Sequence, residues 1–168
     1  KDYKKPPTDK PRLLYIGRLK VEKGIFSFLK IFNELDIDIH LSIVGKTLNK
    51  YLNDKKISYI GHGYPPIELI KLYDSNNIFI LPSFTEAHPK VVDESLARLR
   101  PVIIFEEIQH IIKDKKGIFV VKRDAKSLLK TINFIMDNYE SIQKSIKENI
   151  LPTKEKFISE MTNILSSN

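Results

Sequence analysis

Short apolar runs alternate along the chain with longer segments in which apolar residues recur at helical spacing. The apolar runs occupy residues 13–17, 57–61, 78–83, 101–105 and 117–121. Runs that are apolar throughout are typical of parallel strands covered on both faces. Residues 37–43 instead alternate apolar with polar side chains, and this pattern predicts a half-buried strand.

The segments between and after these predicted strands have the periodicity of amphipathic helices. Apolar residues at intervals of three and four predict helices within residues 25–35, 66–73, 91–99, 128–136 and 157–165. Residues 138–150 are also expected to be helical, with Pro152 ending that helix. The alternation predicts an α/β fold, a doubly wound parallel sheet of about six strands with helices on both faces.

The composition fits one globular domain of ordinary size. The 168 residues are 42% hydrophobic and include no cysteine, so disulfides and thiolate zinc sites are excluded. No apolar stretch approaches the length of a membrane span, and the chain is predicted to be cytoplasmic. Residues 1–11 are rich in Lys and Pro and are interpreted as a linker, followed by a domain at residues 12–168.

The net charge of +7 favours phosphorylated ligands over cationic ones. The lysines are scattered, and no Arg-rich tract or aromatic-studded motif accompanies them, so nucleic acid is not an expected partner. In a doubly wound sheet, ligands bind beyond the carboxyl ends of the strands. The candidate site is therefore formed by the loops GRLKVEKG, GKTLNK, GHGYPP, SFTEAHPK and EEIQH.

Two carboxylates, Glu86 and Glu94, lie eight residues apart after the predicted strand at 78–83. Glycosidases also use two acids, but the doubly wound pattern makes that interpretation a minor alternative. The loop histidines His62, His88 and His110 raise the possibility of a metal site. No acid cluster at ligand spacing accompanies these histidines, so no metal is expected.

With these motifs the chain resembles the C-terminal, donor-binding domain of the retaining GT-B glycosyltransferases of family four. The resemblance covers nearly the whole chain and includes the loop GRLKVEKG, the strands LSIVG and ISYIG, and the segment PSFTEAHPKVVDESLARLRPVI with its E-x7-E pattern. It implies a Rossmann-like half of a GT-B fold, with the N-terminal acceptor domain absent from this chain. It also implies that Glu86 contacts the donor sugar and Glu94 the ribose, while Arg18 and Lys23 hold the diphosphate.

The chemistry of these residue types agrees with the resemblance. A guanidinium and an ammonium on one loop can hold a diphosphate without a metal ion, and carboxylates accept hydrogen bonds from sugar hydroxyls. The predicted catalytic residues are Glu86, Arg18 and Lys23. The predicted donor-binding residues are Gly17, Arg18, Lys23, Lys46, His62, Tyr64, Glu86, Ala87, His88, Pro89, Lys90, Val91 and Glu94.

The sequence departs from the family pattern in three places. Ala87 replaces the Gly that usually follows the first acid, Leu99 and Arg100 stand where a small residue and Gly are common, and FEEIQH replaces a Gly-rich loop. Because glycine lets a backbone approach a ligand closely, these changes could reshape the donor pocket.

The resemblance implies a donor-binding domain that is inactive alone. The donor is expected to be a nucleoside diphosphate hexose, with UDP favoured and no cofactor. The acceptor would be a glycan or lipid-linked molecule in bacterial surface polysaccharide or lipopolysaccharide synthesis, and the full enzyme is expected in the cytoplasm, peripherally at the inner membrane. The alternative is a nucleotide-binding module of a GT-B-fold protein that is not a transferase, either epimerase-like or catalytically silent.

Overall fold

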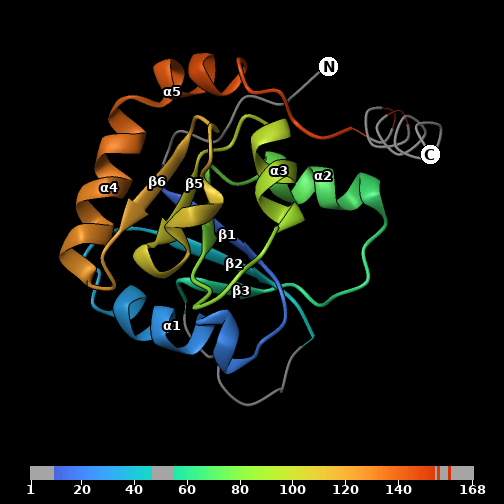
Figure 1. Cartoon of the computed structure of the whole chain (residues 1–168). Coiled ribbons are helices and arrows are strands. Elements are labelled where there is room, and N and C mark those ends of the chain that lie inside the picture. The colour runs from blue at the N-terminus through green and yellow to red at the C-terminus, as the bar shows by residue number, and fades with distance from the viewer. Residues whose placement is uncertain (1–9, 47–54, 154, 156–158, 160–168) are drawn as a thin grey trace.

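The computed structural model describes residues 10–46, 55–153, 155 and 159, which include a six-stranded parallel sheet (Figure 1). The strand order is β3-β2-β1-β4-β5-β6, and every neighbouring pair is parallel. The strands are β1 (Arg12–Ile16), β2 (His40–Val44), β3 (Ile57–Tyr59), β4 (Ile78–Leu81), β5 (Val102–Phe105) and β6 (Ile118–Val121). The doubly wound α/β prediction is confirmed.

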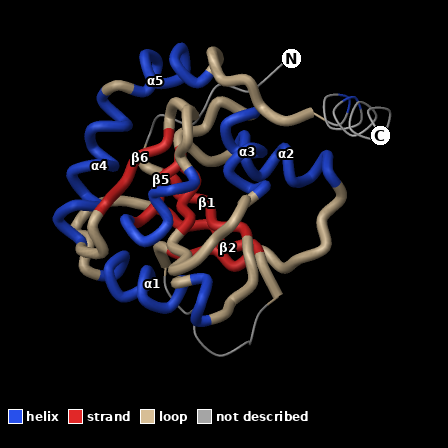
Figure 2. Tube along the Cα trace, viewed as in Figure 1, coloured by secondary structure: helices blue, strands red, loops and turns tan. Residues whose placement is uncertain are grey.

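Helices surround this sheet (Figure 2). The α-helices are α1 (Ile25–Asn33), α2 (Pro66–Asp74), α3 (Lys90–Ala97), α4 (Ala125–Asp137) and α5 (Tyr139–Ile146). Two 3-10 helices, η1 (Val21–Lys23) and η2 (Glu106–Ile111), follow β1 and β5. Helices α1 and α4 lie on one side of the sheet, with α2 and α3 on the other (Figure 1). No helix in the described part of the chain is long and apolar enough to cross a membrane.

The core consists of the strands and the inner faces of these helices. Strands β4 and β5 are buried at every position, as expected of parallel strands covered on both faces. Phe28 of α1 packs against Phe105 of β5 with ring centroids 6.4 Å apart. The apolar stripe of α4 faces inward and buries Leu128, Ile132 and Ile135. The prediction that this stripe belongs to the core is confirmed.

Several boundaries differ from the predictions. The strand predicted at 37–43 is present as β2 but begins at His40, and its Ser42 is 6% exposed, so the prediction that it is half-buried was wrong. Ser42 tolerates burial because its hydroxyl donates to Asn76 Oδ1 at 3.2 Å. Helix α5 ends at Ile146 rather than near Pro152. Most of the predicted helix at 157–165 and most of the predicted linker at 1–11 lie outside the described residues.

The two edges of the sheet carry different structures. Helix α5 lies near the amino-terminal edge, where the Tyr139 hydroxyl donates to the carbonyl of Asn77, just before β4. The carboxyl-terminal edge carries the loops after β1, β4 and β5, which include η1 and η2. The predicted site residues before Pro89 lie in the loops at this edge.

Candidate functional site

The carboxylate of Glu86 is the meeting point of two loops at the carboxyl-terminal edge. Lys23 Nζ donates to Glu86 Oε1 at 2.7 Å, and Ser83 Oγ donates to the same oxygen at 2.7 Å. The side chains of Lys23 and Glu86 are 21% and 12% exposed, and Ser83 is fully buried. Two predicted site residues that are 63 positions apart therefore form a partly buried ion pair.

Local backbone geometry brings these two loops together. Gly24 ends η1 in the left-handed conformation at φ 65°, and a Cβ at this position would lie 1.8 Å from the carbonyl oxygen of Pro82. A residue with a side chain could not bring the first loop so close to the loop after β4. The Phe84 N–H also donates to the carbonyl of Glu22 at 3.0 Å, which fixes Lys23 beside Glu86.

Element η2 holds the backbone of the same loop. His110 Nε2 lies 2.8 Å from the carbonyl oxygen of Glu86, a geometry in which the protonated ring nitrogen donates. His88 is instead near Asp93, at 3.4 Å. Among the described residues, no three His, Cys, Asp or Glu side chains lie close enough together to hold a metal ion.

Arg18 projects from the first loop without joining this ion pair. Its side chain is exposed and makes no hydrogen bond or ion pair with a described residue. Its backbone carbonyl accepts a hydrogen bond from the Tyr15 hydroxyl at 2.8 Å. Burial, and then the charge of Glu86, raise the pKa of that phenol, so it remains a donor. The structure thus fixes the backbone of Arg18 and leaves its guanidinium at the surface.

Glu94 lies in the second turn of α3, and the Tyr73 hydroxyl of α2 donates to its Oε2 at 2.9 Å. The first-turn acid of α3 is Asp93, which pairs with Lys115 Nζ at 2.6 Å. The expectation that Glu94 lies near the start of the helix is thus correct only to within a turn. Its side chain is exposed, so the carboxylate is accessible to a ligand.

The residues between the two acids form the start of α3. Pro89 is the N-cap residue and Lys90 the first residue of the helix, while Ala87 and His88 precede it in an exposed turn. No side chain caps this end of α3. The N–H groups at such an end, with the positive end of the helix dipole, favour an anion.

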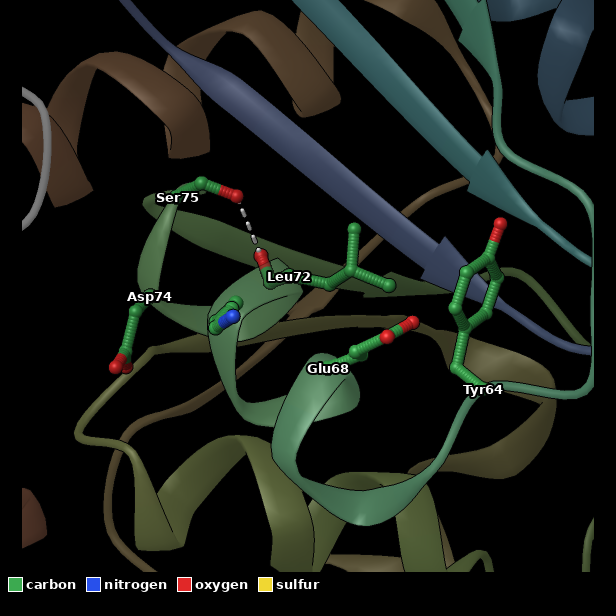
Figure 3. Close-up of a pocket in the computed structure, with 6 residues that line it drawn as sticks. Tyr64, Glu68, Leu72, Asp74 and Ser75 are labelled. Atoms are coloured by element: carbon green, nitrogen blue, oxygen red, sulfur yellow. Dashed lines mark hydrogen bonds between the residues drawn. The ribbon is translucent and has the colours of Figure 1, made fainter.

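The other predicted donor-binding residues lie farther along the edge. Lys46 and His62 are exposed directly after β2 and β3. Tyr64 is half-buried at one end of a hollow of about 600 Å³ along α2 (Figure 3). Asp74 and Ser75 lie at the other end of this hollow, and neither Lys23 nor Glu86 is among the described residues that line it.

The sequence analysis missed three residues that shape this edge. Ser83 lies in the same loop as Glu86, three positions earlier, which is a local signal that was available. Tyr73 gave no signal, because an aromatic residue in an amphipathic helix usually belongs to the core. Arg123 follows β6, and its guanidinium carbon lies 4.2 Å from the ring centroids of both Phe84 and Phe105.

Comparison with known proteins gives one family for this chain. A family model described as "Glycosyl transferases group 1" matches residues 1–151. The teichuronic acid biosynthesis glycosyltransferase TuaC of Bacillus subtilis, named as putative, is 32% identical over 121 residues, which cover 66% of this chain and 31% of that protein. The capsular polysaccharide biosynthesis glycosyltransferase CapM of Staphylococcus aureus is 25% identical over 148 residues, covering 80% of this chain and 39% of CapM.

Solved structures share the fold at low sequence identity. Anabaena HepE in complex with UDP and glucose matches 95% of this chain and 49% of its own, with a TM-score of 0.78 and 12% identity. Sucrose-phosphate synthase of Thermosynechococcus elongatus matches 96% of this chain and 46% of its own, with a TM-score of 0.76 and 19% identity. The chain thus spans between about a third and a half of the length of these relatives.

Proposed function

Because the chain belongs to the glycosyl transferases group 1 family, we propose that it binds the nucleoside diphosphate sugar of a retaining glycosyltransferase. A UDP-hexose is the favoured donor, and a structure of HepE contains UDP. The acceptor would be a glycan or lipid-linked molecule of bacterial surface polysaccharide synthesis, as the names of TuaC and CapM suggest. The full enzyme would work in the cytoplasm, peripherally at the inner membrane.

The observation that carries this proposal is the placement of Lys23 against Glu86 at the carboxyl-terminal edge of the sheet. The ammonium can approach a diphosphate while the adjoining carboxylate accepts hydrogen bonds from the sugar next to it. Arg18, whose guanidinium is exposed in the same loop, can add a bidentate contact to the phosphates.

The positive charge near the leaving group would have a chemical role. Breaking the bond between sugar and diphosphate moves negative charge onto the diphosphate, and fixed cations stabilise that charge in the transition state. Lys23 and Arg18 would supply this charge without a divalent ion. Glu86 would orient the sugar, and Glu94 would accept hydrogen bonds from the ribose hydroxyls.

Calorimetric titration of the chain with UDP, UMP, GDP, ADP and CMP tests this proposal. We expect UDP to bind most tightly and to bind equally well with a chelator present. Lys23→Ala should weaken UDP binding about 10- to 100-fold, since a charge-assisted contact contributes roughly 1.5–3 kcal/mol, while changing UMP binding less.

The matched control is Lys130→Ala, which removes the same charge from the exposed surface of α4. If UMP and UDP bind equally to the unmodified chain, the assignment of Lys23 and Arg18 to a diphosphate is wrong. Binding that requires added magnesium or manganese would contradict the role of these side chains as the source of positive charge.

A further inference from the structure

Tyr73 connects α2 to one of the two acids of the proposed site. This inference rests on the proposed function and concerns how Glu94 is prepared for its ligand. The Tyr73 hydroxyl donates to Glu94 Oε2 at 2.9 Å and also lies 3.4 Å from the carbonyl oxygen of Val91. Tyr73 therefore contacts the proposed ribose-binding carboxylate from a neighbouring helix.

The Tyr73 hydroxyl contacts one oxygen of the Glu94 carboxylate and leaves the other oxygen available to a ligand. A carboxylate accepts about four hydrogen bonds, so Glu94 retains Oε1 and the remaining lone pairs for the two hydroxyls of a ribose. An exposed Glu side chain otherwise moves among many rotamers, and ordering it on binding costs conformational entropy. A donor already attached to Oε2 reduces that cost before the ligand arrives.

Tyr73 is itself rigidly held. Its side chain lies in the core, 2% exposed, with its ring centroid 5.8 Å from that of Phe79. Its backbone carbonyl accepts a hydrogen bond from Arg100 Nε at 3.0 Å. Burial, and then the charge of Glu94, raise the pKa of the phenol, so the hydroxyl stays protonated at neutral and mildly alkaline pH.

The end of α2 is fixed by two arginines from the segment that departs from the family pattern. Arg98 donates to both carboxylate oxygens of Asp74, from Nε at 2.9 Å and from Nη2 at 2.6 Å. Arg100, only 1% exposed, donates to the carbonyls of Tyr73, Asp74 and Arg98. Between them Leu99 adopts φ 57°, the left-handed conformation that favours glycine.

We propose that Tyr73 is a positioning residue that orients Glu94 toward the ribose hydroxyls of the donor nucleotide, with Arg98 and Arg100 fixing the helix end that carries it. Leu99 and Arg100, which depart from the family pattern after Glu94, would thereby help to position Tyr73. They connect α2 to the turn between α3 and β5, and this connection determines where the Tyr73 hydroxyl lies.

The experiment compares the affinities of UDP and 2′-deoxy-UDP for four forms of the chain by calorimetry. These are the unmodified chain, Tyr73→Phe, Glu94→Ala and Tyr139→Phe. Tyr139→Phe is the matched control, because it also removes a partly buried phenol oxygen that donates to a backbone carbonyl, that of Asn77, at 2.5 Å. The ratio of the two affinities is the measured quantity, since an unfolded fraction lowers both affinities equally and cancels.

We expect the unmodified chain and Tyr139→Phe to prefer UDP about tenfold, as hydrogen bonds to a charged acceptor predict. Glu94→Ala should abolish the preference, and Tyr73→Phe should reduce it to about threefold or less. If Glu94→Ala abolishes the preference but Tyr73→Phe keeps it in full, the inference is wrong and the proposed function stands. If the unmodified chain binds no UDP, both the inference and the proposed function are wrong. If Tyr139→Phe loses the preference for UDP as much as Tyr73→Phe does, a specific role for Tyr73 is contradicted.

Discussion

At the scale of single residues, the ion pair of Lys23 and Glu86 gives each charge a partner before any ligand binds. The pair is partly buried, and Ser83 adds a second hydrogen bond to the same carboxylate oxygen. A diphosphate would compete with Glu86 for the ammonium, and the carboxylate would repel the phosphates. Glu86 therefore has opposite effects on the nucleotide and on the sugar of the proposed donor.

Glu86→Gln should separate these two effects. The neutral amide can still accept a hydrogen bond from Lys23, but it no longer attracts the ammonium as a charge or repels the phosphates, so UDP should bind several-fold more tightly, about 1 kcal/mol. The same variant should lose the additional affinity of UDP-glucose over UDP. Titration of both ligands into both forms of the chain measures the difference.

Glu106→Gln is the control for this prediction, because it removes an acid from an exposed position at the start of η2, near the same edge. Glu106→Gln should change the affinity for UDP only slightly. Weaker UDP binding in Glu86→Gln would show that Glu86 supports Lys23 instead of competing with phosphate for it.

The sequence named candidate residues for the site, but it did not predict their mutual contacts. The motif placed Lys23 and Glu86 in two loops, and only the close approach at Gly24 brings the two charges together. Tyr73 was unpredictable for a different reason. An aromatic residue on the inner face of a helix looks like core in any sequence, and here it is core except for its hydroxyl.

At the scale of elements, Arg123 connects four segments that are far apart in the chain. Its guanidinium donates to Glu107 at 2.7 Å, to the carbonyl of Pro82 at 3.0 Å and to Ser27 of α1 at 3.3 Å. Phe84 and Phe105 lie against its guanidinium. The loops after β4, β5 and β6 are thus attached to one another beside the proposed site.

Arg123→Lys should destabilise the fold by roughly 2–3 kcal/mol, because an ammonium cannot make these hydrogen bonds together or lie flat between two rings. Urea unfolding followed by circular dichroism measures the change. Lys122→Met is the control, since the neighbouring side chain is exposed and should change stability little. A stability equal to that of the unmodified chain would mean that the connection contributes nothing to folding.

The same contact has a pH dependence with a definite sign. The hydrogen bond from Arg123 lowers the pKa of Glu107 below its ordinary value of 4.5. A carboxylate whose pKa is lowered on folding stabilises the native state above its unfolded pKa, and this contribution is lost as pH falls through the folded pKa. The stability difference between the unmodified chain and Glu107→Gln should therefore be constant near neutral pH and shrink below about pH 4.5. A difference that grows in acid would contradict this assignment.

Elements were predictable where packing and periodicity agree, and less so where polar contacts decide. In the described part of the chain, five strands and the helices α1 to α4 lie within a few residues of where the apolar pattern predicted them, whereas β2 is shifted to His40–Val44. The pattern at 37–43 misled because Ser42 is buried with a hydrogen-bonded hydroxyl, which hydropathy alone cannot distinguish from an exposed one. Element η2 was also missed, since its sequence lacks a helical stripe.

At the scale of the whole molecule, the proposed donor site lies along one open edge of a parallel sheet. The acids of the proposed site already have partners, Lys23 for Glu86 and Tyr73 for Glu94, and in the proposed function both accept hydrogen bonds from hydroxyls of the donor. Transfer requires a second substrate held within about 3–3.5 Å of the reacting carbon. The chain matches less than half the length of the relatives and structures compared with it here.

The 168 residues alone should therefore bind UDP-glucose and transfer nothing. Binding energy realised on the nucleotide holds the donor but does not by itself lower the barrier to reaction with an acceptor. Incubation of the chain with radiolabelled UDP-glucose and lipid or glycan acceptors, followed by chromatography, measures transfer and hydrolysis together. A full-length member of the family serves as the positive control, and calorimetry on the same sample verifies that the donor is bound. Transfer by the chain alone at a rate similar to that of the full-length enzyme would mean that the edge bearing Lys23 and Glu86 also binds the acceptor. The prediction that this chain binds the donor but does not catalyse transfer would then be wrong.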